Sequence, residues 1–243
     1  MRDNSLARGL IARGHEAHLV PMYLPLQLDE ERADESAPVF FGGINVYLQQ
    51  KYRFFRSLPR WIERAFNGRG LLRRVAKRSH LTSAKEQGEM TCLMLRLEES
   101  NLGKEVDKLI DWLKRDGKPD VILLSNALLV GLVRELKKRL RVPIVCSFQG
   151  AAPFLDSLPE PWRDVAWKEL SVRVQDADIL VSPSQYYGKL MENRLGLEPG
   201  SVQVVPNGID LSGWKESEGG KDKRIGYLSR MCHSEGVGRA VEA

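Results

Sequence analysis

The sequence predicts an α/β fold built on a doubly wound, Rossmann-like parallel sheet. Three observations lead to this prediction: short apolar runs of strand length, helical patterns between them, and steps of roughly 15 residues from one run to the next. The runs lie near residues 120–126, 142–150, 177–184 and 202–205. Continuous apolar runs of this kind are typical of strands that are buried on both faces of a parallel sheet.

The composition is that of an ordinary globular protein. Of the 243 residues, 42% are hydrophobic and 28% are charged. The formal net charge of +5 suits an anionic partner without identifying one. The cysteines Cys92, Cys146 and Cys232 are far apart, with no CxxC pair and no histidine at metal-ligand spacing. They predict reduced thiols in a cytoplasmic protein that has no metal site. No run approaches the roughly 18 apolar residues that a membrane span needs.

The first residues predict a helix over 4–13, with Leu6, Leu10 and Ile11 on one face. Gly14 stands where a helix C-terminal cap is expected, and 16–24 is an extended apolar segment. A helix followed by an apolar strand is the second half of a βαβ unit. Its first strand does not precede the helix, so we expect a chain that is shortened at this end.

Residues 51–78 form a basic and aromatic stretch in which ten lysines and arginines are opposed by Glu63 alone. One interpretation is an insert that touches anionic lipid headgroups or an anionic lipid-linked acceptor at the inner face of a membrane. The other is a solvated basic face whose aromatic side chains turn into the core. Nucleic-acid binding ranks last, because no recognisable nucleic-acid-binding module accompanies the charge.

The middle of the sequence predicts long helices and a place where ligands bind at the ends of the strands. Apolar residues at three- and four-residue spacing predict one helix over 83–115, and further helices are predicted over 128–140, 159–175 and 185–195. Ser184 is well placed to cap the last of these helices. Ligands of open parallel sheets bind beyond the carboxyl ends of the strands. Those ends are expected at 124–126, 147–150, 181–184 and 206–208.

The end of the chain changes character twice. The strand at 202–205 leads into the turn VVPNGID, and a polar connector follows that cannot bury enough apolar surface to order itself. A second apolar strand (225–228) then leads through GYLSR and Arg230 to a helix that begins near Gly236. VVPNGID, a linker and GYLSR together resemble the interdomain junction of retaining glycosyltransferases of the two-Rossmann-domain (GT-B) type, family 4.

The resemblance implies a domain organisation and an activity. It implies an acceptor-side Rossmann-like domain over 1–210, a linker over 211–224, and the first strand and helix of an incomplete nucleotide-sugar-binding domain over 225–243. The chain would then be truncated at both ends. The implied activity is transfer of a hexose, with retention, from a nucleotide sugar such as a UDP- or GDP-hexose to a carbohydrate or lipid-linked acceptor. No cofactor, metal or nucleic acid is implied.

The resemblance also implies site residues. Gln149 and Gly150 occupy the loop that is expected to face the reacting sugar. Gln149 can hydrogen-bond a sugar hydroxyl but cannot act as a general base. The implied residues at the donor diphosphate are Arg230, Glu235 and Gly236, and those at the cleft and hinge are Asn207, Gly208 and Asp210.

The sequence departs from the family pattern at Glu235, where members carry a lysine. A carboxylate there repels a diphosphate by on the order of 1–4 kcal/mol, and His233 would compensate only when protonated. The pair of glutamates that holds the donor sugar in the family is also absent. We therefore expect weak or no activity from this polypeptide. The alternative is a non-catalytic α/β module, derived from a transferase, that binds an acceptor or a membrane surface; a nucleotide-sugar epimerase is a more distant option.

Overall fold

A computed structural model describes residues 2–22, 38–41, 84–100, 102–208, 211, 215 and 237–242 of the chain. The chain divides into two compact units, Met1–Ile209 and Asp210–Ala243, and each is described by itself. The basic stretch 51–78 and the predicted strand 225–228 lie outside the described residues.

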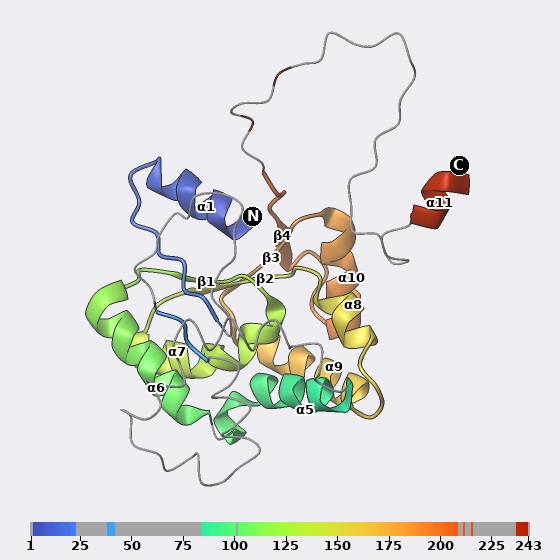
Figure 1. The fold of residues 1–243 in the computed structure, drawn as a ribbon, viewed down its shortest axis with the longest axis horizontal. Helices are drawn as coiled ribbons and strands as arrows, with labels where there is room; N and C mark the ends of the chain where they lie inside the picture. Colours follow the sequence, from blue (N-terminus) through green and yellow to red (C-terminus); the bar gives the residue numbers. More distant parts are fainter. Residues whose placement is uncertain are drawn as a thin grey trace, which may run out of the picture. The chain divides into compact units, whose positions relative to one another are not determined.

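The first unit alternates helices and strands, as the sequence predicts (Figure 1). Its elements are, in chain order, α1 (Arg2–Ile11), α5 (Ala84–Leu95), η3 (Leu97–Glu99), α6 (Gly103–Trp112), η4 (Leu113–Gly117), β1 (Ile122–Leu124), η5 (Ala127–Leu132), α7 (Val133–Leu140), β2 (Ile144–Ser147), α8 (Ala151–Asp156), α9 (Trp162–Arg173), η6 (Val174–Asp176), β3 (Ile179–Ser182), α10 (Gln185–Leu195) and β4 (Val202–Val204). The η elements are 3₁₀-helical, except η4, which is a π-helical turn. In the second unit the structure describes α11 (Val237–Glu242).

The strands form one parallel sheet in the order β1-β2-β3-β4. Leu124 pairs with Cys146, which pairs with Leu180, which in turn pairs with Val202. Each crossover passes through at least one helix, as parallel strands require. The predicted α/β class with a Rossmann-like parallel sheet is confirmed.

The two faces of this sheet differ in burial. Because successive crossovers move in one direction along the sheet and are right-handed, their helices fall on one face, and Figure 1 shows α7 and α9 opposite α1. On the face that these helices cover, the side chains of the paired residues are buried: Leu124, Cys146, Leu180 and Val202. On the other face Leu123 and Ile179 are 39% and 38% exposed. Ser147 and Val181, on this same face, are nevertheless buried, so the expectation of strands buried on both faces holds fully for the first face and in part for the second.

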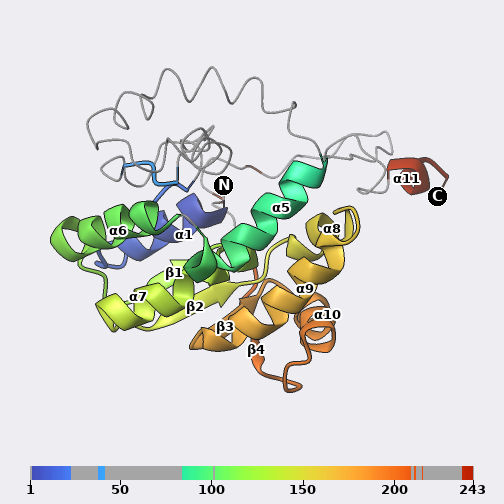
Figure 2. The ribbon, with the colours of Figure 1, turned by 90° about the horizontal axis from the view of Figure 1, so that it is seen from below.

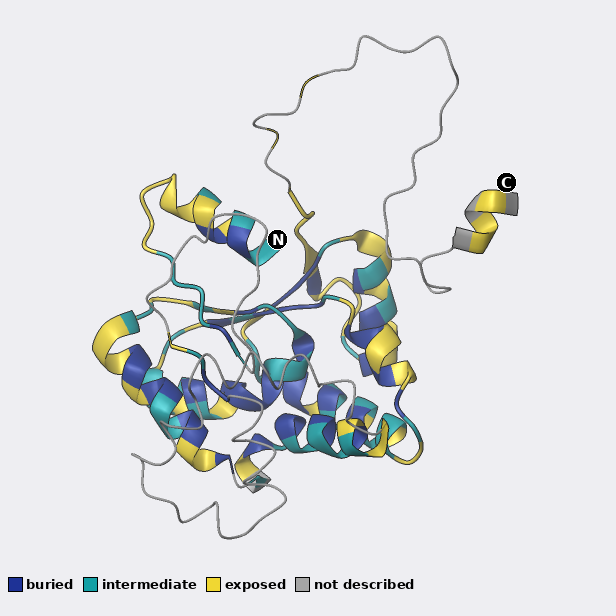
Figure 3. Ribbon diagram, in the orientation of Figure 1, coloured by how far each residue is buried: buried dark blue, intermediate teal, exposed yellow. Residues whose placement is uncertain are grey.

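Two glycines let α5 pack closely against its neighbours. Figures 1 and 2 both show α5 beside α9. A Cβ at Gly88 would lie 2.5 Å from the side chain of Trp162, and a Cβ at Gly131 would lie 2.0 Å from the carbonyl oxygen of Met94. The contact is therefore closer than any larger residue allows at either position. Figure 3 shows most of α5 and α9 as buried or intermediate, with few exposed residues.

The single helix predicted over 83–115 is broken in the structure. It ends at Leu95, passes through η3, and restarts as α6 at Gly103. Ser100 explains the break, because its hydroxyl donates to the carbonyl of Leu97 at 2.7 Å and accepts from the amide of Leu102 at 3.3 Å. Serine competes for backbone groups in this way and favours turns over helix interiors.

Of the extended segment predicted over 16–24, the structure describes residues 16–22, and these form little sheet. Residues 15–21 have no regular structure, and Met22 makes an isolated parallel bridge to Phe40. The apolar pattern was sufficient to bring this segment to the core, where Met22 packs against the buried cluster. It did not supply a partner for a full strand.

Candidate functional site

The carboxyl ends of the four parallel strands share one edge of the sheet, which we call the carboxyl edge: residues 125–126, 147–150, 182–184 and 205–208. Ligands of open parallel sheets bind beyond this edge, because loops there are free to vary above a rigid support. Its residues are mainly serines, amides and glycines. They offer hydrogen bonds rather than charge.

Ser147, the last residue of β2, lies at the centre of the polar contacts on this edge. Its residue is 0% exposed. Its hydroxyl oxygen accepts from Arg2 Nη1 at 3.0 Å and from Gln149 Nε2 at 3.4 Å. Arg2 is the first residue of α1, so two segments 145 positions apart meet at one buried hydroxyl.

The predicted residues Gln149 and Gly150 lie on this edge, in the loop after β2. The carbonyl of Gln149 accepts from Asn126 Nδ2 at 3.5 Å. Asn126 in turn caps η5 by accepting from the amide of Leu128 at 2.9 Å. Gly150 has a φ of 62°, in the left-handed region, and turns the chain into α8. The backbone of the loop is therefore held from β1 and from α8, and the side chain of Gln149 is half-buried.

The helix α8 was missed by the sequence analysis. It is short, and its AAPFLD sequence carries no polar capping residue. It is fixed by tertiary contacts instead: the amide of Ala152 donates to Tyr187 Oη on α10 at 3.1 Å. Ser184 caps α10 by accepting from the amide of Tyr187 at 3.2 Å, which confirms its predicted role.

The predicted hinge residues Asn207 and Gly208 follow β4 and are exposed. Their strand is positioned by Glu192, whose Oε1 accepts from the amides of Gly200 and Val202 at 2.9 and 3.0 Å. The amide of Val205 then donates to the carbonyl of Ser182 at 2.9 Å. The remaining predicted site residues, Asp210, Arg230, Glu235 and Gly236, lie outside the described residues.

Arg2 contacts this edge through Ser147, and the sequence analysis selected neither Arg2 nor its neighbour Asp3. The side chain of Arg2 is 19% exposed, and its Nη1 lies 3.9 Å from Asp3 Oδ1. That oxygen is buried and has no hydrogen-bond partner among the described residues. The helix at 4–13 was predicted, but nothing in a helical pattern tells which strand end its first turn will contact.

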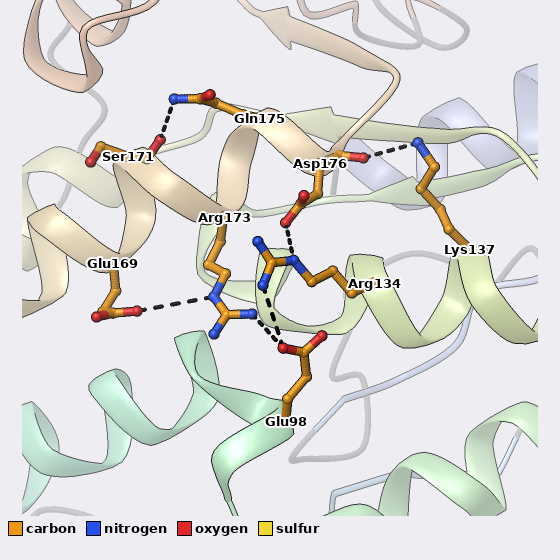
Figure 4. Close-up of polar contacts among 8 residues, drawn as sticks. All are labelled: Glu98, Arg134, Lys137, Glu169, Ser171, Arg173, Gln175 and Asp176. Atoms are coloured by element: carbon orange, nitrogen blue, oxygen red, sulfur yellow. Dashed lines mark hydrogen bonds and ion pairs between the residues drawn. The ribbon is translucent and has the colours of Figure 1, made fainter.

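The opposite, amino edge of the sheet is held by charge (Figure 4). Arg134 and Lys137 on α7 reach Asp176: Arg134 Nε lies 2.7 Å from the carboxylate, and Lys137 Nζ lies 3.0 Å from the carbonyl. Glu98 accepts from Arg173 at 2.8 Å, and Arg134 lies 3.5 Å from the same oxygen. The hydrogen bond from Arg173, more than any other contact, lowers the pKa of Glu98.

Asp178 ties the first residues of β2 and β3 together on this amino edge. Its Oδ1 lies 2.7 Å from Lys137 Nζ, and its Oδ2 accepts from the amide of Ile144 at 2.8 Å. The hydrogen bond from Lys137 and then the one from the Ile144 amide lower the pKa of Asp178. One carboxylate oxygen thus contacts Lys137 of α7, and the other accepts from the amide at the start of β2.

The two described cysteines are structural. Burial raises the pKa of Cys146 to about 12 and also raises the pKa of Cys92, so both remain thiols at neutral pH. Within the described ranges, no three histidine, cysteine or acidic side chains gather closely enough to hold a metal ion. In the same part of the chain, no helix is long and apolar enough to cross a membrane.

Comparison with known proteins adds a family to this geometry. Neither the curated proteins nor the solved structures include a match to this chain. A family model described as Glycosyltransferase Family 4 matches residues 88–212, which is more than half of the 243 residues. The matched segment runs from α5 through the whole four-stranded sheet to the turn after β4. The chain belongs to glycosyltransferase family 4, and the unit Met1–Ile209 has a GT-B-like, Rossmann-type fold.

Proposed function

We propose that this chain takes part in the transfer of a hexose, with retention, from a nucleotide sugar to an acceptor hydroxyl, and that the unit Met1–Ile209 holds the acceptor. The family match over 88–212 carries the proposal. The hydroxyl and amide groups at the carboxyl edge support it, because a sugar is recognised by several directed hydrogen bonds.

The proposed step exchanges one bond for another. The bond between the anomeric carbon and the diphosphate oxygen breaks, and the bond to the acceptor oxygen forms. The proton of the acceptor hydroxyl leaves with the nucleoside diphosphate. No metal or organic cofactor is part of this proposal. Gln149 and Gly150 would face the reacting sugar, with the Gln149 amide hydrogen-bonded to a hydroxyl and not acting as a base.

Donor binding in this proposal depends on residues of the second unit. Arg230, with Gly236 behind it, would neutralise the departing diphosphate. Glu235 would oppose it, which makes turnover by this polypeptide weak. Asn207, Gly208 and Asp210 would be the hinge and cleft residues, followed by the linker 211–224 and the donor-side residues 225–243.

Isothermal titration calorimetry of the full chain with UDP and with GDP tests the donor half. We expect binding of one of the two, its loss in Arg230→Ala, and tighter binding in Glu235→Lys, because an ammonium replaces a repelling carboxylate. Arg13→Ala, on an exposed turn, is the matched control. Release of nucleoside diphosphate from labelled UDP- and GDP-hexoses then measures turnover. Absence of binding by either nucleotide in all variants would contradict the proposal and favour the non-catalytic binding module.

The acceptor in this proposal is a carbohydrate or a lipid-linked carbohydrate, and the protein works in the cytoplasm. The ten basic residues of 51–78 favour peripheral contact with anionic lipid. Vesicles of phosphatidylglycerol should sediment the chain at low salt and release it as salt rises, whereas phosphatidylcholine vesicles should not. Sedimentation that is the same with both kinds of vesicle and at all salt concentrations would instead indicate a solvated basic face.

A further inference from the structure

A guanidinium and an amide meet at the buried hydroxyl of Ser147, and a carboxylate lies beside the guanidinium. Arg2 Nη1 and Gln149 Nε2 both donate to it, at 3.0 and 3.4 Å. A hydroxyl oxygen that accepts two such bonds fixes both donors in direction. Ser147 is fully buried at the end of a paired strand, so the two side chains are held by a rigid element.

These side chains keep unused hydrogen-bonding capacity. A guanidinium carries five N–H donors, and one of those on Arg2, at Nη1, is engaged with Ser147. The side-chain carbonyl of Gln149 has no hydrogen bond recorded among the described residues, and its residue is half-buried. Asp3 has one buried oxygen without a hydrogen-bond partner in that part of the chain, while its side chain is 43% exposed. A ligand can therefore reach this carboxylate through the exposed part of the side chain, where a sugar hydroxyl can donate to it.

The charge at this point of the carboxyl edge is balanced. Arg2 and Asp3 lie 3.9 Å apart and carry opposite charges. A phosphate or carboxylate placed between them would be attracted by one and repelled by the other. A neutral diol meets no such conflict, because each hydroxyl both donates and accepts: it can donate to Asp3 or Gln149 and accept from Arg2.

We infer that Arg2, Asp3 and Gln149 form a subsite for a neutral pair of sugar hydroxyls, and that Ser147 is the positioning residue beneath them. This inference rests on the proposed function, since it names the class of acceptor that the carboxyl edge takes: an uncharged sugar ring and not a phosphorylated one. It involves side chains of α1 and of the loop after β2 only, so it makes no use of the donor-side residues.

The test is a titration of the ¹⁵N-labelled full chain, without nucleotide, followed by heteronuclear NMR. The probes are methyl α-D-glucopyranoside, methyl α-D-mannopyranoside and glucose 6-phosphate. We expect at least one neutral glycoside to shift the side-chain amide signals of Gln149 and Asn126 and the Nε signal of Arg2, and glucose 6-phosphate to bind more weakly. No shift at these signals with any neutral probe overturns the inference.

Variants sharpen the test. Arg2→Gln should weaken glycoside binding roughly 10- to 100-fold, the effect of one charge-assisted hydrogen bond. Asp3→Asn should weaken it too, and should tighten glucose 6-phosphate binding about fivefold because Arg2 is then unopposed. Arg13→Gln, at the far end of α1, should change neither. Unaltered preferences in Asp3→Asn overturn the inference even where Arg2→Gln lowers the midpoint of thermal unfolding.

Failure here is distinguishable from failure of the proposed transfer. A chain that binds UDP or GDP and turns over a donor, yet shows none of these shifts, overturns the subsite alone. A chain that shows the shifts but binds neither nucleotide keeps the subsite as a sugar-binding site and contradicts the donor half of the proposed function.

Discussion

The two edges of the sheet are built from different chemistry. At the amino edge, Asp176 and Asp178 are engaged by Arg134 and Lys137 at 2.7 Å, and Arg173 joins Glu98 in the same layer. At the carboxyl edge, the contacts run through the hydroxyl of Ser147 and the amides of Asn126 and Gln149. At the amino edge the charged groups pair with one another. At the carboxyl edge part of the hydrogen-bonding capacity remains unused.

This difference separates stability from function. Paired charges inside a network cost much free energy when one partner is removed, so they suit an edge that must not move. Neutral groups at strand ends cost little to leave in water and can exchange water for a ligand. We therefore expect the loss of a side-chain contact at the amino edge to act on unfolding, and the loss of one at the carboxyl edge to act on binding. Three predictions test this comparison, from the largest expected effect to the smallest.

Replacing Arg173 by methionine should have the largest effect on stability. Its side chain is 7% exposed and pairs with Glu98 at 2.8 Å and with Glu169 at 4.0 Å. Removing it takes away the short hydrogen bond to Glu98, which keeps only Arg134 at 3.5 Å, while Glu169 keeps Arg96 at 2.7 Å. The free energy of unfolding should therefore fall by roughly 2–3 kcal/mol, the range for a hydrogen bond to a charged group. The measurement is urea unfolding at pH 7. Arg163→Met is the control on the same helix, because Arg163 pairs at the surface and should change stability by less than about 1 kcal/mol. Equal losses in both variants would contradict the distinction.

Gly150→Ala tests the carboxyl edge without removing a contact. A Cβ at Gly150 would meet no atom within 4 Å, but the φ of 62° disfavours any residue with a side chain. The expected cost is about 1–2 kcal/mol in the free energy of unfolding, from backbone strain alone. Gly103→Ala, which has equal space but begins the helix α6, should be neutral or slightly stabilising. If both variants lose the same stability, the strain at Gly150 is not the cause.

Asp178→Asn should change the free energy of unfolding least at pH 7. Its effect should appear in how that free energy depends on pH below about 5. The pKa of Asp178 is lowered in the folded chain, so its contribution is present above the ordinary carboxyl pKa of about 3.9 and is lost as pH falls through the folded pKa. The wild-type chain should therefore lose stability between about pH 5 and pH 2 more steeply than Asp178→Asn. Urea unfolding at several pH values measures both slopes, and parallel slopes would refute the role of this carboxylate.

Much of the fold could be predicted because its signals are local. The apolar runs identify all four described strands, and the helix predicted over 185–195 is found as α10 with its Ser184 cap. The break at Ser100 was missed because side-chain competition for backbone groups is not visible in apolar spacing. The short helix α8 was missed because it is stabilised by Tyr187 of another helix rather than by its own sequence.

The candidate site divides in the same way. The prediction that ligands meet the chain around Gln149 and Gly150 rests on the rule for parallel strands, which needs only the order of elements, and it stays a prediction. That Arg2 and Asp3 lie at the same edge required the folded chain, since 145 positions separate Arg2 from Ser147.

The sequence by itself determined the class of fold, the places where its strands end and the family to which the chain belongs. Periodicity, turn residues and motifs carry this information because each of them involves residues that are close together in the sequence. The tertiary structure alone decided which distant side chains meet. Those contacts depend on how helices and strands pack once the core has closed, and a glycine such as Gly131, which allows two backbones to approach, has no signature outside that packing.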